Sequence, residues 1–242
     1  MQSSFTRREL AGLARMCAAS YDTPPHLVRL AGGVELLHMA AQGSNGAAGP
    51  AIVAIRGSQI RGTEAYEDWR RNLQMDQVWL APPRATRSPA AAGRARVHRG
   101  FADAAIRIEH WWRTAGGPPG GHGLVIAGHS LGGGIAQVLA AWLPAARVAV
   151  FGAPAAGNAA LIELIGERLT RVEHRRDVVC GLLDRVPGCE YVRGGRRVGL
   201  GAPVWRAAIE DALAGRLLRR AIEDHAIERY VEALEAGETH GV

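Results

Sequence analysis

The sequence predicts an α/β domain in which a mostly parallel central sheet carries helices on both faces. Short apolar runs of strand length alternate along the chain with segments whose apolar residues recur at helical spacing. Several of these runs are continuously apolar, which is typical of strands buried on both faces. With 242 residues, of which 48% are hydrophobic, the chain is long enough to bury a large core as one domain, residues 1–242.

The first quarter of the chain predicts a helix, a hairpin and one buried strand. A capping box at residues 6–9 opens the helix, because its threonine and glutamate satisfy free backbone N–H groups. The apolar runs 26–30 and 34–40 flank a pair of glycines and predict a β-hairpin. Residues 51–55 (AIVAI) predict a buried strand. The apolar face of the helix consists of Leu10, Leu13, Cys17 and Tyr21.

The next segments predict a loop and a long helix. Residues 81–95 are rich in proline, alanine and arginine and predict a surface loop. The segment 97–101 (VHRGF) leads from this loop into the helix, and residues 116–121 link the helix to the strand that follows. The large apolar positions of the helix are Ile106, Ile108, Trp111 and Trp112.

Residues 123–134 (GLVIAGHSLGGG) predict a strand, a sharp turn and a helix, with Ser130 at the apex. Such a turn strains the serine backbone, and the flanking glycines remove side chains that would clash there. The hydroxyl then stands clear of the sheet, close to the backbone N–H of Leu131 and the positive end of the helix. The alternative is a glycine-rich turn with an idle serine, but the strand before the motif and the helix after it favour a nucleophile. The apolar positions of this helix are Leu131, Ile135, Val138, Leu139 and Trp142.

Two further strands are predicted downstream, at residues 147–151 and 169–174. Between them, Asn158 is placed to cap a helix, because asparagine accepts hydrogen bonds from the free N–H groups at a helix start. The apolar positions of that helix are Leu161, Ile162, Leu164 and Ile165.

A serine nucleophile needs a base that takes its proton and a carboxylate that orients the base, and in this type of turn the acid precedes the base along the chain. Asp177 and Asp184 are the candidate acids. Asp177 directly follows a predicted strand, as Ser58 and Ser130 do, whereas Asp184 lies in a leucine-bearing loop. Because function gathers at the carboxyl ends of parallel strands, the pattern favours Asp177.

His174, His225 and His240 are the candidate bases. His174 lies inside a predicted strand, where a structural role is expected, and His240 lies in a polar tail. His225 follows residues 217–224, which are expected to be helical, and precedes a terminal helix anchored to the core, so the pattern favours His225. The apolar positions of the terminal helix are Ile227, Tyr230, Val231 and Leu234.

Charge and cysteine content narrow the classes of partner. The net charge is +6 and all 29 basic residues are arginine, but they are interleaved with acids and no recognition motif accompanies them, so no nucleic-acid partner is expected. Cys17 is expected in the core, and Cys180 and Cys189 could pair across a loop, although free thiols are favoured without an export signal. No histidine or cysteine cluster has the spacing of a metal site, so no metal or cofactor is expected.

Localisation is predicted from two absences in the sequence. No run reaches the roughly 18 apolar residues that a membrane-spanning helix needs. The N-terminus has no continuous apolar segment of the kind that directs secretion. We therefore expect a cytoplasmic protein with no transmembrane segment, and secretion by a signal-independent route stays open.

Taken in chain order, these motifs resemble the class 3 lipases, the family of fungal triacylglycerol lipases and their bacterial and plant relatives. The resemblance runs over roughly residues 8–236 and implies an α/β-hydrolase fold, hydrolysis of carboxylic esters and no cofactor. The motifs that carry it are Arg56-Gly57-Ser58, Asp68-Trp69, Val97-His98-Arg99-Gly100-Phe101, Gly128-His129-Ser130-Leu131-Gly132, Phe151-Gly152-Ala153-Pro154, Asp177 and Asp224-His225.

The resemblance implies that Ser130 is the nucleophile, Asp177 the acid and His225 the base. A small-molecule ester or a lipid is the implied substrate. A phospholipase or a thioesterase is the alternative, and a non-catalytic interaction module on a hydrolase fold is a further one. The arginine-rich surface would suit transient contact with an anionic lipid surface.

The implied oxyanion hole combines the backbone N–H of Leu131 with the residue that follows an Arg-Gly pair. The chain has two such triplets, ending at Ser58 and Thr63. Ser58 directly ends a predicted strand and is favoured, because an oxyanion donor must be held rigidly. The lid of the family would correspond to residues 59–69, which carry only three large apolar groups, so short-chain or soluble esters are the expected substrates.

Overall fold

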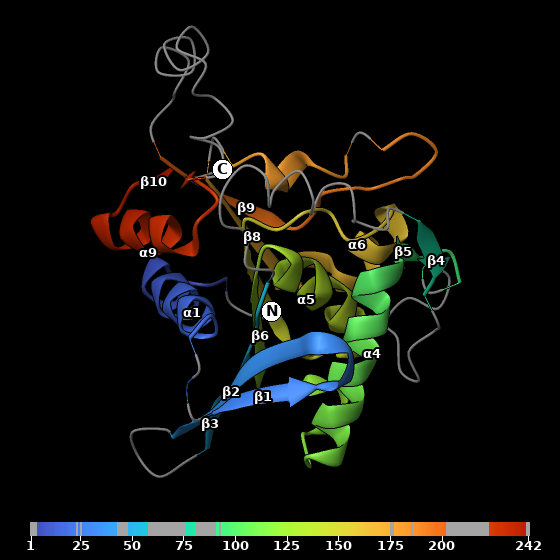
Figure 1. Ribbon diagram of the computed structural model, residues 1–242, viewed down its shortest axis with the longest axis horizontal. Helices are drawn as coiled ribbons and strands as arrows, with labels where there is room; N and C mark the ends of the chain where they lie inside the picture. Colours follow the sequence, from blue (N-terminus) through green and yellow to red (C-terminus); the bar gives the residue numbers. More distant parts are fainter. Residues whose placement is uncertain are drawn as a thin grey trace, which may run out of the picture.

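The computed structural model describes residues 4–22, 24, 26–42, 48–57, 76–80, 91, 93–174, 177–184, 186–201 and 223–240. Within these residues, one large sheet runs through the molecule and helices cover both of its faces (Figure 1). The predicted α/β architecture is therefore confirmed.

The large sheet has eight strands in the described part of the chain. They are β1 (Leu27–Leu30), β2 (Val34–Gln42), β3 (Ala48–Ile55), β6 (Leu124–His129), β7 (Arg147–Phe151), β8 (Leu169–His174), β9 (Arg196–Leu200) and β10 (Thr239–His240). Their spatial order is β1-β2-β3-β6-β7-β8-β9-β10. Neighbours from β3 to β9 pair in parallel, whereas β1, β2 and β10 pair antiparallel with their neighbours. The carboxyl ends of the five parallel strands thus meet at one edge.

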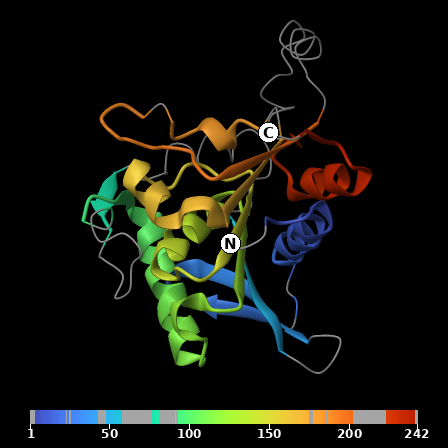
Figure 2. The same cartoon turned by 180° about the vertical axis from the view of Figure 1, so that it is seen from behind.

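Helices form a layer on each face of the sheet. They are α1 (Arg7–Ala19), α4 (Arg99–Thr114), α5 (Leu131–Trp142), α6 (Ala159–Ile165) and α9 (Ile227–Ala236). Helices α1 and α9 lie side by side on one face, whereas α4, α5 and α6 cover the other, as the front view and the view from behind both show (Figures 1 and 2). Short 3₁₀ segments are η1 (Ala31–Gly33), η2 (Pro119–Gly121), η3 (Gly166–Arg168) and η4 (Val179–Gly181).

Each central strand divides its side chains between two cores, because successive residues of a strand point to opposite faces. In β6, Leu124 and Ile126 belong to the core beneath α4, α5 and α6. Val125 and Ala127 of the same strand belong to the core beneath α1 and α9. Burial on both faces explains why this strand is apolar from Leu124 to Gly128.

Local signals at two helix starts are confirmed. The Thr6 side chain accepts from the N–H of Glu9 at 3.2 Å, and the Glu9 carboxylate accepts from the N–H of Thr6 at 2.7 Å. The Asn158 side chain accepts from the N–H of Leu161 at 3.4 Å and caps α6. Cys17 is fully buried in α1, as predicted, and none of the three cysteines, all of which are described, forms a disulfide.

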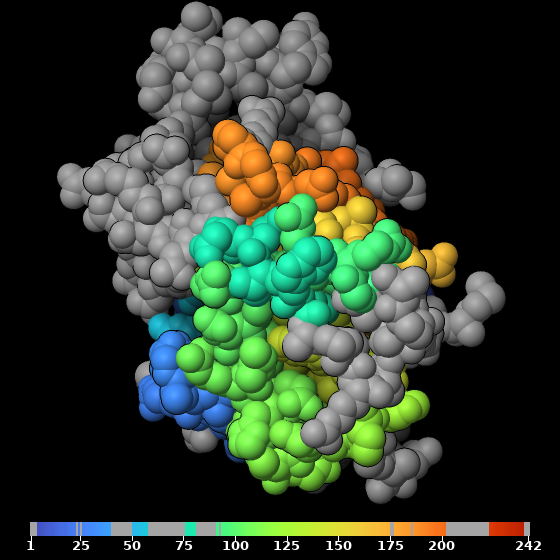
Figure 3. Space-filling view, turned by 90° about the vertical axis from the view of Figure 1, so that its right-hand side faces the viewer, coloured from blue at the N-terminus to red at the C-terminus, as the bar shows by residue number. Residues whose placement is uncertain are grey.

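The prediction of a surface loop at residues 81–95 is wrong at the end of that range. Ala91 and Ala95 are fully buried, while residues 81–90 and 92 lie outside the described part. The N–H of Leu80 donates to the carbonyl of Ala95 at 2.9 Å, next to the antiparallel pair β4 (Gln77–Trp79) and β5 (Arg96–His98). Strand pairing therefore draws these small residues into the core. Figure 3 shows β4 (teal) at the surface, beside α4 (green).

Candidate active site

Ser130 occupies the sharp turn between β6 and α5. Its backbone has φ 56° and ψ −128°, and Ser130 is the one non-glycine residue with a positive φ in the described part of the chain. The two glycines of the motif allow the close packing of this turn. A Cβ on Gly128 would lie 2.3 Å from the carbonyl oxygen of Gly132, and a Cβ on Gly132 would lie 2.2 Å from that of Ile55. Backbone strain of this kind is typical of a functional turn.

The hydroxyl of Ser130 contacts His225, and His225 contacts Asp177. Ser130 Oγ lies 2.9 Å from Nε2 of His225. Nδ1 of the same ring lies 2.8 Å from Oδ2 of Asp177. All three residues are buried. Because a carboxylate faces Nδ1, we assign the proton of the neutral imidazole to Nδ1, which leaves the lone pair of Nε2 facing the hydroxyl.

Two donors hold the carboxylate of Asp177, which lies just beyond the end of β8. The N–H of Val179 donates to Oδ1 at 2.8 Å. The hydroxyl of Tyr230, which comes from α9, donates to Oδ2 at 2.6 Å. Tyr230 also accepts from the N–H of His174 at 3.2 Å. The carboxylate is therefore fixed from both sides before it meets His225.

His225 lies in a turn that precedes α9, and its backbone is held by His129. Nε2 of His129 lies 2.8 Å from the carbonyl oxygen of His225. Because a carbonyl only accepts, His129 donates from Nε2 and its Nδ1 carries no proton. Burial lowers the pKa of His129 well below its usual range, which keeps the ring neutral. Nδ1 lies 2.8 Å from the hydroxyl of Tyr21, so Tyr21 is the donor in that bond.

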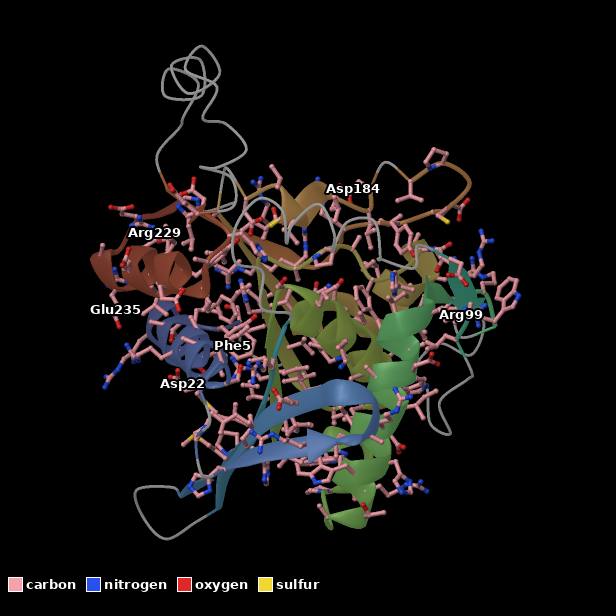
Figure 4. The ribbon with its side chains drawn as sticks, in the orientation of Figure 1. Phe5, Asp22, Arg99, Asp184, Arg229 and Glu235 are labelled. Carbon is pink, nitrogen blue, oxygen red and sulfur yellow. The ribbon has the colours of Figure 1, made fainter. Side chains whose placement is uncertain are left out.

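The other candidate residues lie elsewhere in the described structure. Asp184 follows η4, where Figure 4 labels it, and its Oδ2 pairs with Nε of Arg193 at 2.7 Å. Nδ1 of His174 lies 3.8 Å from Oδ2 of Asp224. His240 belongs to the edge strand β10, and its side chain lies outside the described part.

Ser58, Thr63 and the lid region at residues 59–69 lie outside the described residues. The approach to them is described, because Gly57 follows β3 beside the nucleophile. A Cβ on Gly57 would lie 3.0 Å from Cβ of Ser130. Leu131 is the first residue of α5, so its N–H has no acceptor within the helix.

Three polar residues around this site were not predicted to belong to it. Tyr21 and Tyr230 were expected on apolar helix faces, and His129 had no expected role. A usable signal was present, because a buried tyrosine hydroxyl normally finds a hydrogen-bond partner. Among the described residues, no group of three or more histidine, cysteine, aspartate or glutamate side chains could hold a metal ion.

Among the described helices, none has the length and apolar character needed to cross a bilayer. Helices α1 and α9 carry charged groups on their outer sides, including the ion pair between Arg15 and Glu235; Figure 4 labels Glu235 and Arg229 on α9. Phe5, labelled in the same view, lies beneath the guanidinium of Arg147, whose Cζ is 3.8 Å from the ring centroid.

Sequence comparison relates the chain to one family. The family model described as Lipase (class 3) matches residues 57–186, more than half of the chain. The matched range includes Ser130 and Asp177 and ends before His225. A search of curated proteins finds no significant match.

Comparison with solved structures identifies the fold. The Lip2 lipase from Yarrowia lipolytica is 17% identical with a TM-score of 0.58, over 83% of this chain and 83% of that chain. A triacylglycerol lipase from Penicillium expansum is 15% identical with a TM-score of 0.55, over 82% of each chain. The Rhizomucor miehei triacylglyceride lipase is 16% identical with a TM-score of 0.54, also over 82% of each chain. These matches show a shared α/β-hydrolase fold.

Proposed function

Because the chain belongs to the class 3 lipase family, we propose that it is a serine hydrolase that cleaves carboxylic esters through an acyl-enzyme. The observation that carries this proposal is the continuous contact from Ser130 Oγ to His225 Nε2 at 2.9 Å and from His225 Nδ1 to Asp177 Oδ2 at 2.8 Å. This is the geometry of a nucleophile, a base and an orienting acid.

Acylation begins with proton transfer from the Ser130 hydroxyl to Nε2 of His225. Oγ attacks the ester carbonyl carbon and forms a tetrahedral intermediate whose former carbonyl oxygen carries the negative charge. Asp177 stabilises the imidazolium that results and keeps its ring in place. When the intermediate collapses, His225 returns the proton to the departing alcohol oxygen and the acyl group remains on Oγ.

Deacylation repeats these steps with water as the nucleophile. His225 takes a proton from the water molecule, the resulting hydroxide attacks the acyl carbonyl, and collapse of the second intermediate releases the carboxylic acid. The proton on Nε2 then returns to Oγ of Ser130. No metal or organic cofactor takes part in this scheme.

We place the oxyanion between the N–H of Leu131 and the hydroxyl of the residue that follows Gly57. The close approach of Gly57 to Ser130 supports Ser58 over Thr63, because Ser58 is bonded directly to a residue that already packs against the nucleophile. Loss of one oxyanion donor costs about 2.7–4 kcal/mol of barrier, or 100- to 1,000-fold in turnover. Ser58→Ala is expected to lose turnover to this extent with little change in melting temperature, and Thr63→Ala is expected to lose less. The reverse order would assign the role to Thr63.

A fluorophosphonate probe tests the proposal directly, because it reacts covalently with an activated serine. The protein should take up one probe, located at Ser130 by peptide mass spectrometry. Ser130→Ala should abolish both labelling and ester hydrolysis, whereas Ser4→Ala, which removes an exposed serine, should change neither. Labelling that persists in Ser130→Ala contradicts the proposal.

The substrate class follows from a parallel series of assays. We propose short-chain or soluble esters as the better substrates, to be measured with p-nitrophenyl esters of increasing acyl length. A phospholipid and an acyl thioester in the same series distinguish an esterase from a phospholipase or a thioesterase. A rate that rises steeply with acyl length, and further on emulsified substrate, would contradict this preference.

A further inference from the structure

The hydroxyl of Tyr21 contacts two chain segments next to the nucleophile. Tyr21 follows the C-terminal end of α1, far from Ser130 in sequence, and is half-buried. Its hydroxyl lies 2.8 Å from Nδ1 of His129, the residue that precedes Ser130. The same oxygen packs against the backbone of Gly57, because a Cβ on that glycine would lie 2.6 Å from it. One hydroxyl therefore touches both chain segments that flank the candidate site.

The direction of the bond between Tyr21 and His129 is fixed. His129 donates from Nε2 to the carbonyl of His225, so its Nδ1 is an acceptor and the Tyr21 hydroxyl donates to it. Burial raises the pKa of Tyr21, which keeps the hydroxyl protonated and able to donate.

The phenol ring is held independently of its hydroxyl. Cζ of Arg56 lies 5.5 Å from the ring centroid of Tyr21. The ring meets the imidazole of His129 edge to face, with centroids 5.8 Å apart. A Cβ on Gly57 would lie 2.6 Å from the Tyr21 oxygen, so no larger residue fits between the loop and the hydroxyl without displacing one of them. Gly57 and His129 therefore limit where the Tyr21 hydroxyl can lie.

We propose that Tyr21 is a positioning residue that sets the distance between the oxyanion side and the base side of the site. On one side, its packing against Gly57 keeps that residue beside Ser130. On the other side, its bond to His129 orients the ring that holds the backbone of the His225 turn. The role rests on the function proposed above, and it makes α1 a part of the catalytic framework.

Removal of the hydroxyl alone tests the role. Tyr21→Phe keeps the ring and both of its ring contacts, breaks the bond to His129 and removes the oxygen that packs against Gly57. The expected result is a fall in kcat of about tenfold to a hundredfold with KM nearly unchanged, because misplaced catalytic groups affect the transition state more than substrate binding. The rate of fluorophosphonate inactivation should fall in parallel.

Two variants of His129 separate the base side from the oxyanion side. His129→Gln keeps an N–H donor near the position of Nε2, and His129→Met removes it. We expect the glutamine variant to retain more turnover than the methionine variant, and His129→Met to lower kcat in the same direction as Tyr21→Phe. Equal turnover in the two His129 variants would overturn the link through His129 to His225.

A matched control distinguishes positioning from a general loss of stability. Leu13→Ala removes a buried side chain from α1, the helix that precedes Tyr21. It should lower the melting temperature at least as much as Tyr21→Phe and leave kcat near the wild-type value. If the kcat of Leu13→Ala falls as far as that of Tyr21→Phe, the effect is structural and the positioning role is wrong.

A readout that does not depend on activity completes the test. In wild type, the ¹⁵N spectrum of His129 should show a neutral ring with its proton on Nε2 and a hydrogen bond at Nδ1. In Tyr21→Phe, the Nδ1 resonance should move to the position of a nitrogen with no donor. An unchanged resonance overturns the assignment of Tyr21 as donor.

The outcomes separate the two proposals. A wild-type protein that hydrolyses no ester and resists the fluorophosphonate overturns the proposed function, and the positioning role with it. An active wild type whose Tyr21→Phe variant has the same kcat overturns the positioning role alone.

Discussion

The hydroxyl of Tyr230 donates to Oδ2 of Asp177 across 2.6 Å, and the same oxygen faces Nδ1 of His225 at 2.8 Å. Tyr230 is fully buried in α9, and Asp177 lies beyond the end of β8. The hydroxyl also accepts from the N–H of His174, which fixes its orientation. The docking of α9 on the sheet therefore determines where the proposed acid points, as well as covering the core.

Tyr230→Phe should lower both stability and turnover. A hydrogen bond to a charged group contributes about 1.5–3 kcal/mol, so the free energy of unfolding should fall by this order in a urea titration. The carboxylate keeps its bond from Val179 but loses one of its two fixed points, so kcat should fall by roughly tenfold. Tyr191→Phe, which removes another buried tyrosine hydroxyl, is the control and should retain kcat. Equal kcat in the two variants would contradict the prediction.

The choice between the two candidate acids predicts opposite results for two asparagine variants. Asp177→Asn keeps the size of the side chain but presents an amide to Nδ1 of His225, so kcat should fall on the order of 10⁴-fold while the protein stays folded. Asp184→Asn removes an ion pair with the partly exposed Arg193 and should leave kcat nearly unchanged. Steady-state kinetics with circular dichroism as the folding control would decide. A crippled Asp184→Asn enzyme would transfer the role to Asp184.

Much of this arrangement could be predicted because it depends on local sequence. The predicted strands at 147–151 and 169–174 coincide with β7 and β8, since each is a continuous apolar run of strand length. The positions of Ser130 and Asp177 then follow, because both come at or just after the end of a parallel strand. His225 was favoured because of chain order and the anchored helix behind it, whereas the turn in which it lies was not predicted.

The contacts that support the site could not be predicted in the same way. Tyr230 and Asp177 are 53 residues apart, and their hydrogen bond depends on how α9 docks against β8. In the sequence, Tyr230 is simply one member of an apolar helical face. The burial of Ala91 and Ala95 has a similar origin, because it follows from the pairing of β4 with β5 and not from the composition of the segment.

Adding one methyl group should have opposite effects at two glycines. Gly132→Ala would place a Cβ 2.2 Å from the carbonyl oxygen of Ile55, which belongs to a central strand and cannot move freely. We expect a loss of about 3 kcal/mol or more in the free energy of unfolding, or failure to fold. Gly12→Ala adds its methyl inside α1 with no atom within 4 Å, and should stabilise the protein by roughly 0.5–1 kcal/mol. Thermal melts of Gly132→Ala and Gly12→Ala measure the two changes in stability. A Gly132→Ala protein as stable as wild type would contradict the close packing of the turn.

The buried His98 should make stability depend on pH. Burial lowers its pKa to about 4, and its Nε2 has no hydrogen-bond partner among the described residues. The unfolded chain takes up a proton at this side chain near pH 6.5, whereas the folded protein does so only near pH 4. The free energy of unfolding should therefore decrease as pH falls from about 6.5 to 4, by roughly 3 kcal/mol from this residue, and then level off.

His98→Asn isolates this contribution. Asparagine can still cap α4 by accepting from the N–H of Phe101, but it does not titrate. The decrease in stability between pH 6.5 and 4 should be smaller in the variant, whatever its stability at pH 7. Urea titrations across this range measure the slope, to which His129 also contributes in the same direction. An equal slope in wild type and variant would contradict the prediction.

The last prediction concerns His225 as the base. In the structure, the residue lies in a turn and not within a helix, and its ring faces both Ser130 and Asp177. We propose that Nε2 of His225 takes the serine proton, because it lies 2.9 Å from Ser130 Oγ. His225→Ala should abolish turnover while the melting temperature changes little. Because this variant leaves space beside Ser130, added imidazole should restore part of its activity, and the same addition should not restore Ser130→Ala.

His174→Ala and His240→Ala should remain active. An active His225→Ala enzyme that gains nothing from imidazole would move the base role to one of those two, and His174 would be tested first because its backbone already contacts Tyr230.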